Sequence, residues 1–118
     1  MNGINLAEFA GDKTDKTFKI RYIEDDQWFN SEEALQKKLP RPILLFTGGE
    51  ADIYHWYNAT GFQTHTLAQK YGGLVVVTEH RYFGESKPFG AESLKKGNVQ
   101  FLSTENALMD VANLIKHI

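Results

Sequence analysis

The segment Val75–Gly90, VVVTEHRYFGESKPFG, contains a serine, a histidine and a glutamate, which are residue types of nucleophilic catalysis. A nucleophile elbow needs the pattern Gly-x-Ser-x-Gly on a sharp strand-to-helix turn, so that the serine hydroxyl is exposed. Gly84 and Ser86 fit the first half of this pattern, but Pro88 stands where the second glycine should be. Ser86 also lies well beyond the end of the expected strand. We therefore expect its hydroxyl to stabilise a loop and not to attack a substrate.

Glu79 and His80 stand beside each other at the start of this loop, where a carboxylate and an imidazole could form part of a catalytic triad. Neighbouring residues in an extended strand point to opposite faces, so Glu79, His80 and Ser86 cannot converge as a triad. Glu79 and Arg81 are two residues apart and share a face. We expect these two to form an ion pair, and we interpret the loop, with Gly84 and Ser86, as structural.

The loop Thr47–Asp52, TGGEAD, follows a short apolar run and carries two glycines and two acids. Glycines directly after a buried strand let the backbone approach a ligand, and their N–H groups can face an oxyanion. Glu50 and Asp52 would add negative charge at the carboxyl end of the sheet, where ligands of α/β folds bind. A tight turn with solvated acids explains the same residues equally well, so both interpretations stay open.

Metal and nucleotide sites lack their sequence patterns. The histidines show no H-E-x-x-H spacing and no cysteine accompanies them; they are His55, His65, His80 and His117. Gly48 and Gly49 belong to neither a G-x-G-x-x-G pattern nor a P-loop with its lysine. We expect no metal and no cofactor.

The elements that must position these residues follow an α/β order. Thr17–Tyr22 alternates apolar and polar residues, which is typical of a half-buried strand. Ile43–Phe46 and Leu74–Val77 are continuous apolar runs, which suit strands covered on both faces, as in parallel sheets. Phe62–Tyr71 has helical spacing, and Ser103–Ile118 carries the apolar stripe of an amphipathic helix. This order predicts an α/β fold with a mostly parallel sheet.

The composition fits a single small globular domain. The chain has 118 residues, 42% of them hydrophobic and 24% charged, and no cysteine. Its net charge of −2, with both signs interspersed, lacks the basic patch of a nucleic-acid-binding protein. No apolar run reaches the roughly 18 residues of a membrane span, and the first residues lack the pattern of a signal peptide. We expect neither a nucleic acid nor a membrane as partner.

The chain divides into two parts. Met1–Lys16 is polar and contains glycine, which predicts a mobile lead-in. Residues 17–118 hold the strands and helices, but the last helix reaches Ile118 with no strand after it, so broad apolar faces would stay bare. We expect residues 17–118 to be the N-terminal part of a larger α/β domain, incomplete at its C-terminal side.

The ordered motifs of the chain resemble one family of serine peptidases. In chain order they are R-Y-x5-W-F, I-L-L-F-T-G-G-E-A-D-I, N-A-T-G-F, E-H-R-Y-F-G-E-S-K-P-F-G and F-L-S-T-E-N-A-L-M-D-V-A-N-L-I-K-H. Their order and spacing, from Thr17 to Ile118, are similar to the lysosomal Pro-X carboxypeptidase family. This family also contains the lysosomal dipeptidyl peptidase that releases N-terminal dipeptides ending in proline or alanine.

The resemblance implies a partial α/β-hydrolase fold, limited to the strands and helices before the nucleophile elbow. It places the Ser, Asp and His of the catalytic triad beyond Ile118, so the chain alone is predicted to be inactive. By the same resemblance, Gly49 is expected to donate the second N–H of the oxyanion hole, and Glu50 to help hold a substrate's free amine. The loop from Glu79 to Ser86 resembles the structural Asp-x-Arg-Gly-x-Gly-x-Ser loop that follows strand four of many α/β-hydrolases.

Two residues depart from the family's T-G-N-E-G-D loop. Gly49 replaces an asparagine, which removes a side-chain amide, and Ala51 replaces a glycine, which adds a Cβ where the family has none. The sequon at Asn58 matches a glycosylation site of the family. The resemblance further implies a lysosomal or secreted protein, although this chain carries no signal peptide.

The function that follows from the resemblance is the hydrolysis of peptide bonds next to proline near a chain end, with a peptide substrate as partner. Carboxypeptidase and dipeptidyl-peptidase specificity both stay open, and so does the oligomeric state, since family members can dimerise. The alternative is a non-catalytic, truncated homologue that acts as a binding or regulatory partner. A third interpretation is a fragment that does not fold.

Overall fold

The computed structural model describes residues 4–13 and 16–118, and within them the sheet has the strand order β1-β2-β4-β3. The strands are β1 (Ile4–Lys13), β2 (Lys16–Asp25), β3 (Ile43–Thr47) and β4 (Leu74–Thr78). β2 pairs antiparallel with both β1 and β4, whereas β3 and β4 are parallel. The fold is therefore a mixed α/β structure, and the expectation of a mostly parallel sheet is wrong.

The antiparallel pairing of β2 with both of its neighbours accounts for this difference. The sequence predicts a lead-in for Met1–Lys16, but ten of these residues form β1, while residues 1–3 and 14–15 lie outside the described part. Strands that are close in sequence pair antiparallel, because a short connection suffices. The alternation in β1 is weak: the inward-facing residues include the small Ala7 and Gly11, whereas Ile4 and Leu6 are exposed. The period-two pattern is thereby obscured.

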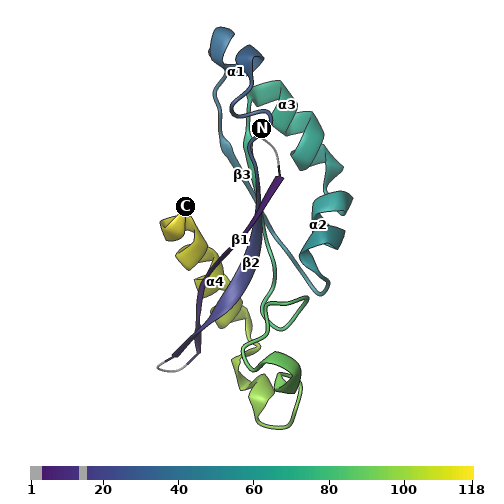
Figure 1. Ribbon diagram of the computed structural model, residues 1–118, viewed down its shortest axis with the longest axis vertical. Helices are drawn as coiled ribbons and strands as arrows, with labels where there is room; N and C mark the ends of the chain where they lie inside the picture. The colour runs from purple at the N-terminus through teal and green to yellow at the C-terminus, as the bar shows by residue number, and fades with distance from the viewer. Residues whose placement is uncertain (1–3, 14–15) are drawn as a thin grey trace.

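The helices cover both faces of the sheet (Figure 1). The connection from β3 to β4 contains α2 (Ile53–Ala59), the π-helix η1 (Phe62–Leu67) and α3 (Ala68–Tyr71) on one face. The opposite face carries α4 (Thr104–His117). Short elements complete the chain: α1 (Glu32–Gln36) between β2 and β3, and the 3₁₀-helices η2 (Gly90–Glu92) and η3 (Asn98–Phe101) in the loop before α4.

Alternate residues of β4 contribute to two apolar clusters. Val75 and Val77 pack with Ile23 and with the buried side of α2, while Val76 faces the other way, toward Leu114 of α4. All five of these side chains are fully buried. The continuous apolar run of β4 therefore reflects a strand that is covered on both faces, as the sequence predicts.

The amphipathic helix expected at the end of the chain forms α4, and the Ser103 side chain caps it by accepting a bond from the Asn106 N–H at 3.2 Å. Leu114 is buried against the sheet, but Leu108 and Ile115 are 63% and 56% exposed. The apolar stripe of α4 is thus wider than the surface that the described residues cover.

Two absences hold for residues 4–13 and 16–118. None of their helices is long and apolar enough to cross a lipid bilayer. Within the same residues, no three His, Cys, Asp or Glu side chains gather into a possible metal site.

Candidate ligand site at the carboxyl edge of the sheet

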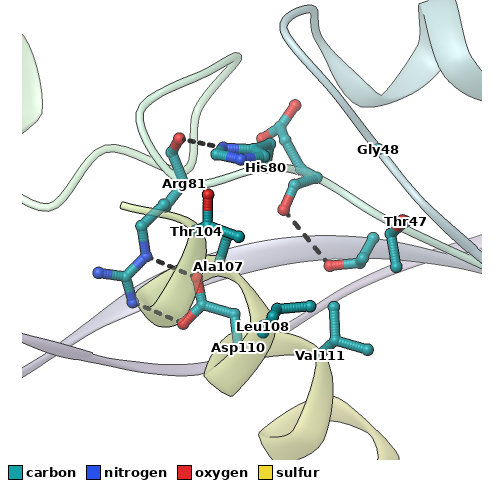
Figure 2. A pocket seen from close by; sticks show the side chains of 11 residues that line it. Thr47, Gly48, His80, Arg81, Thr104, Ala107, Leu108, Asp110 and Val111 are labelled. Atoms are coloured by element: carbon teal, nitrogen blue, oxygen red, sulfur yellow. Dashed lines mark hydrogen bonds and ion pairs between the residues drawn. The ribbon is translucent and has the colours of Figure 1, made fainter. Parts of the chain in front are cut away.

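The carboxyl ends of β3 and β4 share one edge of the sheet, because the strands are parallel and Thr47 pairs with Thr78. The loop Gly48–Asp52 leaves this edge toward α2, and a second loop, starting at Glu79, leads to α4. A pocket of about 160 Å³ lies between the edge and the first turns of α4 (Figure 2). Its lining includes Thr47, Gly48, His80, Thr104, Leu108 and Val111. Ligands of α/β sheets bind at such an edge, which makes this pocket the candidate site.

The two glycines of the loop Gly48–Asp52 differ in their backbone partners. The Gly48 N–H donates to the Thr78 carbonyl at 2.9 Å, and a Cβ on Gly48 would lie 2.4 Å from that oxygen. The Gly49 N–H, in contrast, has no hydrogen-bond partner among the described residues. Gly48 lines the pocket and Gly49 does not. Gly49 therefore has a free backbone donor beside the pocket, and its role at an oxyanion stays a prediction.

The indole of Trp56 explains why residue 49 carries no side chain. A Cβ on Gly49 would lie 2.9 Å from Cζ2 of Trp56, which is closer than two carbon atoms that are not bonded to each other normally approach. The indole is held in place by Phe46, with ring centroids 5.9 Å apart. The asparagine of the family motif would thus require Trp56 to move. The Ala51 N–H donates to the Gly49 carbonyl at 2.8 Å, so the loop closes a tight turn despite the added Cβ.

The two acids of this loop have different surroundings. The Asp52 side chain caps α2, because its Oδ1 accepts from the N–H groups of Tyr54 at 2.8 Å and His55 at 3.1 Å. Glu50 is exposed and lines a second, open pocket of about 260 Å³ together with His80. Both acids are exposed, but only Glu50 lines a pocket, and substrate contacts of either acid stay predictions.

The expected ion pair between Glu79 and Arg81 does not form. Arg81 binds Asp110 of α4 instead, with Nε donating to Oδ2 at 2.7 Å and Nη2 to Oδ1 at 2.6 Å (Figure 2). Glu79 binds Arg21 of β2, with distances of 2.9 Å and 2.7 Å. The strand ends at Thr78 and Arg81 already lies in a turn, so the rule that residues i and i+2 of a strand share a face does not apply.

The two buried carboxylates have opposite pKa shifts. Burial favours a raised pKa for Glu79, but hydrogen bonds from Arg21, from Ser86 and from the Ile53 N–H outweigh it and hold this pKa below its ordinary value. Burial also raises the pKa of Asp110, and there the hydrogen bonds from Arg81 only partly oppose the rise. Folding thus favours the anionic form of Glu79 and disfavours that of Asp110.

Ser86 is enclosed by the structural loop. Its side chain is fully buried, its Oγ donates to Glu79 Oε1 at 2.7 Å, and the same Oγ accepts from the Arg21 N–H at 2.9 Å. A nucleophilic hydroxyl needs an open face for the substrate and a base beside it. In this arrangement the hydroxyl is bonded on two sides and offers no open face.

Sequence reasoning missed the place of His80. This side chain lines both pockets, and its Nδ1 lies 2.8 Å from the Arg81 carbonyl oxygen. A carbonyl only accepts, so Nδ1 carries the hydrogen and Nε2 of the neutral ring is an acceptor. The available signal was position: His80 follows directly after a buried strand, at the edge where ligands bind.

The structural role of Asp110 is also missing from the sequence analysis. This aspartate is only 4% exposed and pairs with the fully buried Arg81. The signal was an aspartate within the apolar stripe of the last helix, between Met109 and Val111. Charges are rarely buried without a partner, so such an aspartate indicates a buried cation nearby.

Asn58 lies exposed near the end of α2, and the hydroxyl of Thr60 in the same sequon donates to the Trp56 carbonyl at 2.9 Å. The asparagine side chain is thus accessible in the folded chain. Its glycosylation stays a prediction.

Comparison with known proteins finds one family. The sequence profile of the family described as "Serine carboxypeptidase S28" matches residues 5–118. The chain is 42% identical over 109 residues to the "Lysosomal Pro-X carboxypeptidase" of Homo sapiens, which covers 92% of this chain and 20% of that protein. The Bos taurus protein of the same name is 39% identical with the same coverage. A putative serine protease of Caenorhabditis elegans is 34% identical over 102 residues, covering 86% of this chain and 18% of its own length. The chain thus spans about a fifth of the length of these relatives.

Proposed function

The chain belongs to the serine carboxypeptidase S28 family, and we propose that it supplies the N-terminal part of a serine-type exopeptidase. The complete enzyme hydrolyses peptide bonds next to proline near a chain end. In this proposal the 118 residues contribute the oxyanion loop, and the Ser-Asp-His triad comes from polypeptide outside them. The names of the relatives and the small share of their length that the chain spans support the proposal. So does the enclosed hydroxyl of Ser86.

The observation that carries the proposal is the free N–H of Gly49 at the carboxyl edge of a parallel strand pair. When a serine attacks a peptide carbonyl, negative charge develops on the carbonyl oxygen, and backbone N–H groups fixed nearby stabilise it. Gly48 cannot serve, since its N–H already binds Thr78. Gly49 is then the donor from this loop, within an α/β-hydrolase arrangement of the whole enzyme.

The remaining features of the proposal concern location, glycosylation and the substrate. The names of the relatives support a location in the lysosome, and we propose that the protein resides there or is secreted. We also propose that Asn58, which is exposed, carries a glycan. The peptide substrate has proline next to its scissile bond. Glu50, which is exposed beside the pocket, holds a free substrate amine if the enzyme acts from the amino end.

The proposal predicts that the Gly49 amide, not the space around it, matters for turnover. We expect Gly49→Pro, which removes the N–H, to lower kcat of the complete peptidase by about 10²–10³-fold. Gly49→Ala is the matched control, because it also places a Cβ against Trp56 but keeps the amide. Both variants are assayed on a peptide with proline next to its last residue and on one with proline second from a free amino end.

The proposal holds if Pro lowers kcat at least about tenfold more than Ala does on the substrate that the enzyme prefers. Equal losses in the two variants would mean that the loop needs space and not a donor, which contradicts the oxyanion role. A complete protein that hydrolyses neither peptide would contradict the proposed activity itself.

A further inference from the structure

The side chain of Glu79, at the carboxyl edge of the sheet, accepts hydrogen bonds from β2, from the start of α2 and from its own turn. Glu79 Oε1 accepts from Arg21 Nε at 2.9 Å, from the Glu85 N–H at 3.0 Å and from Ser86 Oγ at 2.7 Å. Its Oε2 accepts from Arg21 Nη2 at 2.7 Å and from the Ile53 N–H at 2.9 Å. The side chain is 0% exposed, so these bonds replace all of its contact with water. An ionised carboxylate offers about four acceptor positions, and here all are occupied.

The turn after β4 is shaped around this carboxylate. Gly84 has a φ of +57°, and a Cβ at that position would lie 1.9 Å from Glu79 Oε2. The Glu79 N–H also donates to the Arg21 carbonyl at 2.9 Å, so both backbone and side chain of Glu79 are bound to β2. Glu79 therefore has one fixed position relative to the sheet.

The hydrogen bond from the Ile53 N–H to Glu79 Oε2 also fixes one end of the loop Gly48–Asp52. Ile53 is the first residue of α2, and the loop lies directly before it. At its other end the loop is held by the Gly48 N–H, which binds the carbonyl of Thr78. Two adjacent residues, Thr78 and Glu79, thus hold the two ends of the loop that contains Gly49 and Glu50.

We propose that Glu79 is a positioning residue that holds the Gly48–Asp52 loop in the shape that presents the Gly49 N–H to the substrate. This inference rests on the proposed function of that loop. A residue that only stabilised the fold would act on all parts of the sheet alike. A positioning residue acts on the loop beyond its effect on global stability.

Two variants separate these roles. Glu79→Gln replaces one oxygen by an NH₂ group, and because Oε1 accepts three of the five bonds, we expect the NH₂ group to take the place of Oε2. Arg21 Nη2 and the Ile53 N–H then lose their acceptor. Ser86→Ala is the matched control, because it removes a hydrogen bond to the other oxygen, Oε1, and leaves the bond between Oε2 and Ile53 in place. The first measurement is amide hydrogen exchange of the chain, comparing Ile53 with Val76 in the core of β4.

We expect Glu79→Gln to speed exchange at Ile53 at least about tenfold more than at Val76, and Ser86→Ala to change both sites by the same factor. In the complete peptidase, Glu79→Gln should lower kcat by about 10–100-fold with KM within about threefold, because the donor acts mainly in the transition state. Ser86→Ala should leave kcat within about threefold.

Equal acceleration at Ile53 and Val76 in Glu79→Gln would overturn the inference, as would an unchanged kcat in an active enzyme. If the variant does not fold, wild-type exchange decides: the inference requires Ile53 to be as protected as Val76, and exchange at the rate of exposed loop amides overturns it. A complete protein without peptidase activity, but with the expected exchange pattern, would refute the proposed function. It would still support the conclusion that Glu79 holds the Gly48–Asp52 loop in place.

Discussion

Glu79 and Asp110 are both carboxylates buried at the carboxyl edge of the sheet, yet acid acts on them in opposite directions. The folded-state pKa of Glu79 lies below its ordinary value of 4.5, so its ionised form stabilises the fold above that pH. This contribution is lost as the pH falls through the folded-state pKa. The pKa of Asp110 is raised above 3.8, so the folded state binds its proton more tightly than the unfolded chain does. This preference adds to the free energy of unfolding at low pH and is lost as the pH rises through the folded-state pKa.

At the residue scale we therefore predict a pH-dependent cost of Glu79→Gln. At about pH 7 the substitution should lower the free energy of unfolding by about 3–5 kcal/mol, because it removes the buried negative charge that pairs with the half-buried Arg21 and takes an acceptor from the Ile53 N–H. Below pH 4.5 the cost should begin to shrink, and it is lost as the pH falls through the lower folded-state pKa of Glu79, where the wild-type carboxylate is protonated too. Urea unfolding of both proteins across this range measures the difference, in which the contribution of Asp110 cancels.

The control for this measurement is Glu85→Gln, which changes an exposed acid in the same turn. Its cost should be small at every pH. A cost of Glu79→Gln that stays constant from neutral to acidic pH would show that the ionised carboxylate gives no special stabilisation.

At the scale of elements, one arginine attaches α4 to the rest of the fold. Besides its bidentate pair with Asp110, Arg81 donates from Nη1 to the Phe101 carbonyl at 3.0 Å and from Nη2 to the Asp12 carbonyl at 3.1 Å. The guanidinium is fully buried, and it also lies over the ring of Phe18, 5.3 Å from its centroid. The helix, the loop before it and the end of β1 are thus joined at a single charge.

Removal of its counterion should loosen this junction. We predict that Asp110→Ala lowers the free energy of unfolding by about 3–5 kcal/mol, because it leaves the Arg81 charge buried and unpaired. Glu92→Ala, which breaks the exposed pair between Glu92 and Lys95, is the control and should cost about 0–1 kcal/mol. Chemical denaturation measures both. Similar costs for the two variants would mean that α4 is not attached through this pair.

At the scale of the whole molecule, periodicity in the sequence indicated the elements that face a core on regular spacing. β2 and α4 follow from their apolar periods, and β4 from a continuous apolar run that is buried on both faces, whereas the similar run of β3 is only partly buried. β1 does not, since its inward face is partly made of small residues and its outward face carries exposed apolar ones. The sheet is mixed because β2 runs antiparallel to both β1 and β4, and the order of the apolar runs does not indicate these pairings.

The candidate site was predictable in its place but not in its contacts. The loop with Gly49 follows a buried strand, and that position alone indicates the carboxyl edge of a sheet. The partners of Glu79 and Arg81 lie 58 and 29 residues away in sequence. Local spacing suggested that the two side chains pair with each other, and only the arrangement of β2 and α4 gives each its actual partner.

The central claim is that this chain supplies an oxyanion donor and not the nucleophile. Its most direct test is to react the complete peptidase, and separately this chain, with a fluorophosphonate that labels activated serines, and to locate the label by peptide mass spectrometry. We predict a labelled serine outside residues 1–118 in the complete protein and no label on the chain alone, since Ser86 is fully buried with its hydroxyl bonded on two sides. A label on Ser86, or on any other serine of these 118 residues, would contradict the account.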